Sequence, residues 1–189
     1  MKYIIEHLEK RLYTWCFLEY QHISKIVGRK NLIFANIRTT AQAKKLGKLG
    51  NAIKKSVLRL GLARAIILDP QASITLTQQD CKKSKYLIFG GILGNDPPEK
   101  RTTKHFKAML HQGYTARNLG KKQTSTDTAV LVAHMIAHGK KLSEIPFKDG
   151  IEIDIKEGEQ VILPYRYVLK NKKPILAPGM LDFLKRKGF

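Results

Sequence analysis

Short runs of apolar residues recur along this chain. Residues 32–35, 65–68 and 86–89 are each four positions long, and residues 2–8 open the chain with a similar run. Runs this short and continuous are typical of strands buried on both faces of a parallel sheet. Their alternation with helical segments predicts an α/β fold, with a mainly parallel sheet and helices on both faces.

Apolar spacing places the helices between these runs. Residues 15–27 carry apolar groups at helical spacing and end at Gly28, and residues 40–60 carry them three or four positions apart. Residues 127–138 leave almost no polar face, so that helix should be buried. Its N-cap is expected at Ser125 or Thr126.

The C-terminal quarter has a different pattern. Residues 151–155 and 160–163 alternate or run apolar around a short charged turn, which predicts a β-hairpin. Residues 181–187 could form a short basic helix. We therefore expect residues 1–189 to form one domain, in which 151–189 are a β-hairpin and basic C-terminal extension.

Charge is the most unusual global property. The chain has 35 Lys and Arg against 15 Asp and Glu, for a formal net charge of +20. Such an excess favours RNA or a ribonucleoprotein as partner, since phosphate contacts release counterions. Part of it lies on the helix predicted at 40–60. That helical face is either a nucleic-acid contact or an ordinary solvated surface, and it is formed by Lys44, Lys48, Lys55 and Arg59.

Several classes of protein are not indicated. No run of eighteen apolar residues exists and the N-terminus lacks a signal-peptide layout, so we expect a soluble cytoplasmic protein without membrane contact. Cys16 and Cys81 form no Cys-x-x-Cys pair, which argues against a disulfide framework or a zinc site. His134 and His138 have metal-ligand spacing but no evident third ligand, so packing is preferred and no metal is predicted.

Two loops follow strands of the predicted sheet. The first contains Gly90, Gly91 and Gly94 before an Asn-Asp-Pro-Pro turn, and the second is the polar segment 120–126. Glycines let a ligand approach the backbone closely. Ligands of open α/β sheets bind beyond the carboxyl ends of the strands. A binding site is therefore expected where these two loops meet.

Motifs spread over nearly the whole chain resemble a family of SPOUT-class methyltransferases. The matching segments are residues 2–7, 18–20, 89–98 with Arg101 and Thr102, 118–120, 123–129, 145–147 and 165–168. Members of this family are often labelled RNA methyltransferases dependent on S-adenosylmethionine. Its best-studied relatives methylate an arginine of a small-subunit ribosomal protein.

The resemblance implies a trefoil knot in the C-terminal part of the sheet, with S-adenosylmethionine bound in it. Such knots are rare, and periodicity alone gives no sign of one. The loops after Leu68, Phe89 and Leu119 would surround the cofactor. Its predicted contacts are Asp69, Gly90, Gly91, Ile92, Leu93, Gly94, Leu119, Gly120, Thr126, Asp127, Thr128 and Ala129.

Catalysis by such an enzyme requires alignment of the acceptor with an already activated methyl group. A guanidinium acceptor needs carboxylates to position it and take up a proton, and the candidates are Asp96, Glu99, Glu19 and Glu6. For an RNA acceptor, Arg101 could instead hold a phosphate. The net charge favours RNA or a ribosomal particle and the family favours a ribosomal-protein arginine.

RNA methylation is the preferred hypothesis. Protein arginine methylation is the alternative, and a non-catalytic RNA-binding factor is the third. The sequence is compatible with a monomer or a homodimer.

Overall fold

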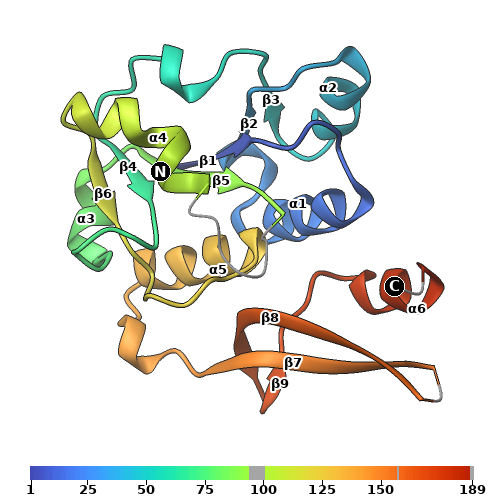
Figure 1. Cartoon of the computed structure of the whole chain (residues 1–189). Coiled ribbons are helices and arrows are strands. Elements are labelled where there is room, and N and C mark those ends of the chain that lie inside the picture. Colours follow the sequence, from blue (N-terminus) through green and yellow to red (C-terminus); the bar gives the residue numbers. More distant parts are fainter. Residues whose placement is uncertain (94–100, 157, 188–189) are drawn as a thin grey trace.

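The computed structural model describes residues 1–93, 101–156 and 158–187 of the chain. Its centre is a six-stranded sheet in which every pairing between neighbouring strands is parallel, in the order β3-β2-β1-β5-β4-β6 (Figure 1). The strands are β1 (Lys2–His7), β2 (Leu32–Ala35), β3 (Asn51–Ala52), β4 (Ala65–Leu68), β5 (Tyr86–Gly91) and β6 (Thr115–Arg117).

Helices cover both faces of this sheet, as the sequence predicts. They are α1 (Thr14–Val27), α2 (Thr40–Leu46), α3 (Gln78–Lys83), α4 (Arg101–His111), α5 (Thr126–Ala137) and α6 (Met180–Lys187), with short 3-10 turns η1 (Arg29–Asn31), η2 (Val57–Arg59) and η3 (Leu142–Glu144). The α1 and α5 helices lie on one face of the sheet. The α4 helix and η2 lie on the other.

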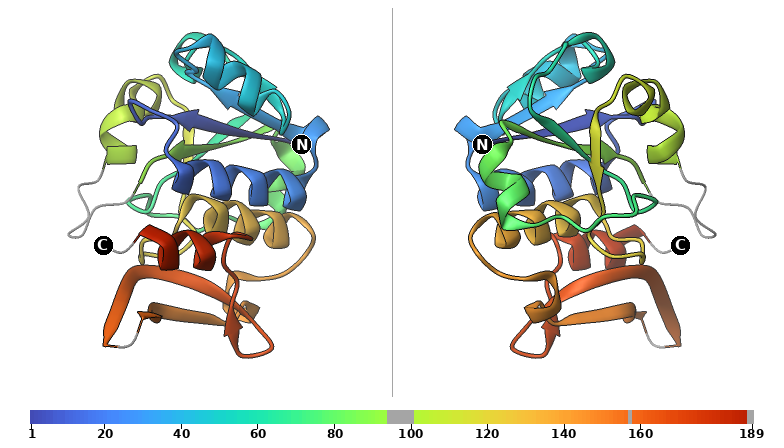
Figure 2. Two further views of the ribbon diagram at one scale, coloured as in Figure 1. Left: turned by 90° about the vertical axis from the view of Figure 1, so that its right-hand side faces the viewer. Right: turned by 90° about the vertical axis from the view of Figure 1, so that its left-hand side faces the viewer.

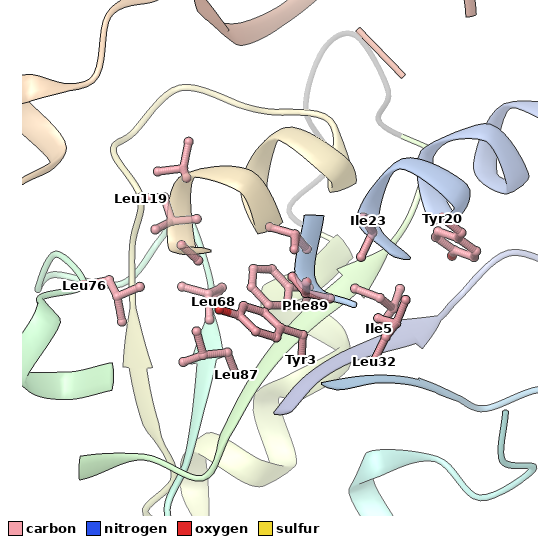
Figure 3. Close-up of a cluster of buried hydrophobic side chains, with 14 of the residues drawn as sticks. Tyr3, Ile5, Tyr20, Ile23, Leu32, Leu68, Leu76, Leu87, Phe89 and Leu119 are labelled. Atoms are coloured by element: carbon pink, nitrogen blue, oxygen red, sulfur yellow. The ribbon is translucent and has the colours of Figure 1, made fainter. Parts of the chain in front are cut away.

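Alternation along the strands explains why both faces are apolar. On β1, Tyr3 and Ile5 point toward α1 and α5, while Ile4 between them packs with the residues of α4. Figure 3 shows the larger core, where Tyr3, Ile5 and Phe89 lie between the sheet and the helices. A strand with two buried faces cannot alternate apolar and polar residues, which accounts for the continuous apolar runs.

A separate three-stranded antiparallel sheet follows η3. It consists of β7 (Phe147–Lys156), β8 (Glu159–Lys170) and β9 (Lys173–Pro174). Ile151, Leu163 and Tyr167 of this sheet form a core with Met180 and Leu184 of α6, against which Trp15 and Leu18 of α1 pack. The views in Figure 2 place this sheet beneath α5 and α6, on the side away from β1.

Two of the predicted elements require correction. The helix expected over residues 40–60 ends at Leu46, and β3 and η2 occupy the rest of that segment. A Cβ at Gly50 would lie 2.7 Å from the carbonyl oxygen of Leu32, so this glycine allows a close approach to β2 that a helix would prevent. The hairpin also begins at Phe147 instead of residue 151, and its second strand, β8, runs from Glu159 to Lys170.

Within the described residues, no helix is long and apolar enough to cross a membrane. The trefoil knot implied by the resemblance stays a prediction.

Candidate active site at the carboxyl ends of β4, β5 and β6

A cavity of about 440 Å³ opens at the carboxyl ends of β4, β5 and β6. This is the edge at which α/β sheets bind their ligands. The three loops predicted from the sequence, after Leu68, Phe89 and Leu119, all contribute to its wall. The lining residues are Leu68, Asp69, Pro70, Gln71, Phe89, Gly90, Ile92, Arg101, Thr102, Thr103, Leu119, Gly120, Lys121, Lys122, Gln123, Thr124, Ser125, Thr126 and Ala129.

Asp69 fixes the loop that follows β4. Its side chain is buried, and Oδ1 accepts hydrogen bonds from the backbone N–H of Gln71 at 2.9 Å and the hydroxyl of Thr103 at 2.8 Å. Its own N–H donates to the carbonyl of Arg117 at 2.9 Å. Asp69 thereby joins β6, its own loop and α4, so its role in the wall is to hold three segments together.

Asn118 fixes the loop that follows β6. The side-chain amide donates to the carbonyl of Ala72 at 2.8 Å, and its oxygen accepts from the Thr75 hydroxyl at 3.1 Å and the Gly120 N–H at 3.0 Å. Gly120 has a φ of +97°, a conformation that residues other than glycine rarely adopt. Asn118 and Gly120 together set the direction in which the loop enters the cavity wall.

The second sheet holds the far end of the same loop. The backbone N–H of Arg166 on β8 donates to the carbonyl of Gln123 at 2.8 Å, and Thr124 and Arg166 form an isolated parallel β-bridge. The Arg166 guanidinium pairs with Asp149 of β7, with Nε 2.5 Å from Oδ1, and lies over the ring of Phe147. A cavity wall is therefore anchored to the C-terminal hairpin.

Gly90 and Gly91 have different surroundings although they are adjacent. Gly90 lines the cavity, where a Cβ would lie 3.0 Å from the Thr102 hydroxyl. Gly91 lies in the core, where a Cβ would overlap the hydroxyl of Tyr20 and lie 2.8 Å from Ile5. Gly90 thus borders the cavity, and Gly91 borders the core.

A buried acidic cluster lies behind the cavity wall, where α1 meets α5. Oε1 of Glu19 accepts a hydrogen bond from Trp15 Nε1 at 2.8 Å. Burial raises the pKa of Glu19 well above its ordinary value, and the nearby Asp127 raises it further, while hydrogen bonds from Trp15 and from Thr126 of the wall act in the opposite direction. Asp127 itself pairs with His22, whose Nδ1 lies 2.7 Å from Oδ2.

Glu9 and Arg101 form an ion pair at the other end of the cavity. Arg101 Nη1 lies 3.1 Å from Glu9 Oε1, and the same oxygen accepts the N–H of Leu93 at 3.1 Å. Arg101 therefore lines the cavity from the first turn of α4 in a fixed position. Further charged groups of the cavity wall are Asp69 in the loop after β4 and Lys121 and Lys122 in the loop after β6.

The chain is similar to known proteins over nearly its whole length. A family model described as "Protein arginine N-methyltransferase SFM1-like" matches residues 2–188. The chain is 38% identical over 203 residues to protein arginine N-methyltransferase SFM1 of Saccharomyces cerevisiae, covering 98% of this chain and 95% of that protein.

The chain belongs to the SFM1-like family.

Solved structures agree with this assignment. The structure of yeast SFM1 complexed with SAM superposes with a TM-score of 0.89 at 36% identity, over 98% of the SFM1-like chain and 90% of the yeast chain. A dual-specific Trm10 protein from Thermococcus kodakaraensis has a TM-score of 0.57 at 16% identity, over 76% and 96% of the respective chains, and supports the fold alone. The prediction of a SPOUT-class methyltransferase is confirmed.

The predicted cofactor contacts divide into two groups in the SFM1-like chain. Those that line the cavity are Asp69, Gly90, Ile92, Leu119, Gly120, Thr126 and Ala129. Those that support the wall from behind are Gly91, Leu93, Asp127 and Thr128. Gly94 lies outside the described residues.

The predicted catalytic residues also separate. Glu19 and Arg101 lie at the cavity or directly behind it, as described above. Glu6 does not: its buried carboxylate accepts from the Ser56 hydroxyl at 2.5 Å and the Val57 N–H at 3.1 Å and lies 3.2 Å from His105 Nε2, so it connects β1 to η2 and α4. Asp96 and Glu99 lie outside the described residues.

Sequence reasoning missed a large part of the wall. Thr102 and Thr103 at the start of α4 and the side chains of residues 121–125 line the cavity without having been predicted as contacts. Glu9 was also missed, although it follows β1 at the same edge as the two loops. The rule that ligands bind beyond the carboxyl ends of parallel strands would have identified it if applied to β1.

His134 and the four basic residues predicted to contact nucleic acid do not line the cavity. His134 packs against Tyr3, whose hydroxyl is 3.0 Å from Nδ1, and no group of three metal-binding side chains occurs in the described part of the chain. Lys44 is on α2, but Lys48, Lys55 and Arg59 follow it in loops and η2, so the four do not share a helix face. All four are exposed.

Proposed function

We propose that this chain transfers a methyl group from S-adenosylmethionine to an arginine side chain of a protein. Support comes first from the family, whose model describes protein arginine N-methyltransferases. Structures of yeast SFM1, at 34–36% identity, have been solved with SAM, SAH and MTA. The hypothesis that RNA is the methyl acceptor was based on net charge, and net charge does not show that the cations lie at the cavity. The family favours a protein arginine as the acceptor.

The cavity is suited to the cofactor. Its volume falls within the range of roughly 300–1,000 Å³ found for small-molecule sites. Apolar side chains of Leu68, Phe89 and Leu119 offer a surface for an adenine ring, and Arg101, Lys121 and Lys122 offer cations for a carboxylate. S-adenosylmethionine supplies a methyl group that is already activated on a sulfonium.

Arginine methylation places a specific demand on the protein. A guanidinium is protonated, with a pKa above about 12, so one N–H proton must leave as the new N–C bond forms and the S–C bond breaks. A carboxylate beside the acceptor can hold the guanidinium and receive that proton. In the described residues, Glu19 is the buried carboxyl with a raised pKa, and it borders Thr126 of the wall.

Glu19 is the residue we assign to this role. Without a guanidinium, burial favours its neutral form, and an arriving cation favours the ionised form by direct attraction. The pairing of Asp127 with His22 keeps a second carboxylate fixed behind it. The position of Glu19 is the observation that carries this assignment: its carboxyl is buried beside Thr126 of the cavity wall, and no cation of the described residues forms an ion pair with it.

The acceptor is tested with labelled S-adenosylmethionine and whole ribosomes as the probe. Products are digested separately with protease and with RNase, and the protein fraction is hydrolysed to detect methylarginine. We expect protease to release the label as methylarginine. Label released by RNase alone would overturn the proposal.

Glu19 is tested with Glu19→Gln. Transfer should fall by about 100-fold or more, the range for loss of a positioned acid or base, with cofactor affinity by calorimetry retained within about threefold. In the wild type, kcat/KM should rise with pH above the ordinary glutamate range of about 4.3, because ionised Glu19 is the active form. If Glu19→Gln still shows this rise of kcat/KM with pH, a group other than Glu19 causes it.

A further inference from the structure

The excess charge of this chain is concentrated in one continuous segment. Residues 20–68 contain no Asp or Glu and eleven basic residues, while the other 140 positions hold 24 basic and 15 acidic residues. About a quarter of the chain thus carries +11 of the net +20. The eleven are Lys25, Arg29, Lys30, Arg38, Lys44, Lys45, Lys48, Lys54, Lys55, Arg59 and Arg64.

All eleven side chains are exposed. In the described part of the chain, none of them forms an ion pair with a carboxylate, whereas Arg101, Arg117 and Arg166 each have one. Repulsion among unpaired cations opposes folding, and a surface salt bridge would cost little to add. This surface is therefore arranged to meet an anion from outside the chain.

Most of these residues lie along the β3–β2 edge of the sheet, whereas Arg64 directly precedes β4. The segment forms the end of α1, then η1, β2, α2, β3, η2 and β4, and β3 is the edge strand farthest from β6 (Figure 1). Arg38 follows β2, and Lys54 and Lys55 follow β3, so these three lie at the carboxyl ends of strands, as the cavity does. The loops are joined, since the Asn36 N–H donates to the carbonyl of Lys55 at 3.0 Å. We call this surface the basic edge.

We propose that the basic edge binds the phosphate backbone of folded RNA, so that the arginine to be methylated is presented by a protein bound to that RNA. This inference rests on the proposed function and adds where the substrate is found. RNA is the molecule on which the enzyme docks, and the methyl acceptor is still an arginine. A net charge of +20 repels a free basic protein, whereas RNA beside that protein reverses the sign.

The chemistry of the basic edge favours a structured nucleic-acid backbone over other anions. The aromatic residues of the segment, Tyr20 and Phe34, are buried, which leaves no exposed ring on which single-stranded bases could stack. Thr39, Thr40 and Asn51 are exposed among the cations and can reach 2′-hydroxyl groups, which distinguish RNA from DNA.

An acidic protein would fit the basic edge less well. Protein interfaces have an apolar centre, and the large exposed apolar side chain in this segment is Leu58 alone. A surface of spread cations without such a centre is typical of phosphate binding.

The test measures RNA binding without any methyl donor. A fluorescent RNA duplex of about 20 base pairs is titrated by anisotropy between roughly 50 and 200 mM salt, since each phosphate contact contributes about −0.9 to the slope of log K against log salt. The edge variant is Lys44→Gln, Lys48→Gln, Lys55→Gln and Arg59→Gln. The control variant is Lys82→Gln, Lys83→Gln, Lys140→Gln and Lys141→Gln, whose side chains are also exposed.

Both variants lower the formal net charge from +20 to +16, so they differ only in where the charge is lost. We expect the edge variant to lose about two to four units of slope and at least tenfold affinity, and the control variant to stay within about twofold of wild type. Thermal melts verify that both are folded.

Equal losses in the two variants would overturn the proposal, as would wild-type protein that does not bind the duplex. A DNA duplex or a polyglutamate peptide that binds as tightly as the RNA would also refute it. Failure of RNA binding with methylarginine still formed refutes this inference alone. RNA binding without methylarginine refutes the proposed function and leaves the basic edge as an RNA surface.

Discussion

Gly90 and Gly91 offer a direct test of how the end of β5 is divided between ligand and core. Replacing Gly91 with Ala would place a methyl group on the Tyr20 hydroxyl, 2.8 Å from Ile5 Cγ2 and 3.1 Å from the carbonyl oxygen of Glu6. One of these is backbone and all three belong to the core beneath α1. The added carbon therefore cannot be accommodated by rotating an exposed side chain.

The magnitude follows from two contributions. Overpacking a core by one methyl group costs about 1–3 kcal/mol. Moving Tyr20 also breaks its 3.0 Å hydrogen bond with His7 Nδ1, which adds about 1 kcal/mol. We expect Gly91→Ala to lower the free energy of unfolding by about 2–4 kcal/mol, and at about 3 kcal/mol the melting temperature of a chain this long falls by roughly 6–12 °C.

Gly90→Ala is the matched control. Its added Cβ would lie 3.0 Å from Thr102 Oγ1 and 3.2 Å from Ile92 Cδ1, both ends of side chains that border the cavity. We expect a change in stability of less than about 0.5 kcal/mol, but at least tenfold weaker binding of S-adenosylmethionine. Urea unfolding and calorimetry measure the two quantities. If Gly91→Ala were as stable as wild type, or Gly90→Ala bound the cofactor normally, the assignment would be wrong.

Three further substitutions test the wall and its supports. Asn118→Ala removes the side chain that joins the loop after β6 to Ala72, so urea unfolding should show a loss of about 2–4 kcal/mol. Glu6→Gln should lower stability but leave cofactor affinity, measured by calorimetry, within about twofold of wild type. If the variant is folded but transfers no methyl group, Glu6 is a catalytic residue after all. Burial raises the pKa of Glu19, so its favourable contribution is present at low pH and is lost as pH rises through the folded-state pKa. Glu19→Gln should therefore gain stability over wild type from pH 5 to pH 8, and a constant difference would contradict the buried neutral form.

The sheet could be predicted from sequence because its strands have two buried faces. The runs at 32–35 and 65–68 match β2 and β4 residue for residue, since turns bound each short apolar run. The helix predicted at 40–60 failed for a related reason. Leu46, Leu49 and Ile53 have helical spacing, but they contact the core from a helix, a turn and a strand end. The spacing of apolar residues alone gives no sign of the close approach of Gly50 to β2.

The site was predicted at the level of loops and less well at the level of side chains. Gly90 lines the cavity, whereas the side of Gly91 on which a Cβ would stand is filled by Tyr20 and Ile5 of the core. The glycines are visible in the sequence, but the position at which the strand ends is not. Net charge could not decide the methyl acceptor, because it counts cations without locating them, and eleven of them lie along residues 20–68.

The hydrogen bond from the Arg166 amide to the Gln123 carbonyl has a consequence for how the molecule opens. Hydrogen exchange at that amide requires the cavity loop and β8 to separate, so its protection measures a local opening that spans both sheets. A ligand that steadies the loop should slow exchange at Arg166, although this amide belongs to the hairpin. The C-terminal hairpin thus provides a remote reporter of whether the site is filled.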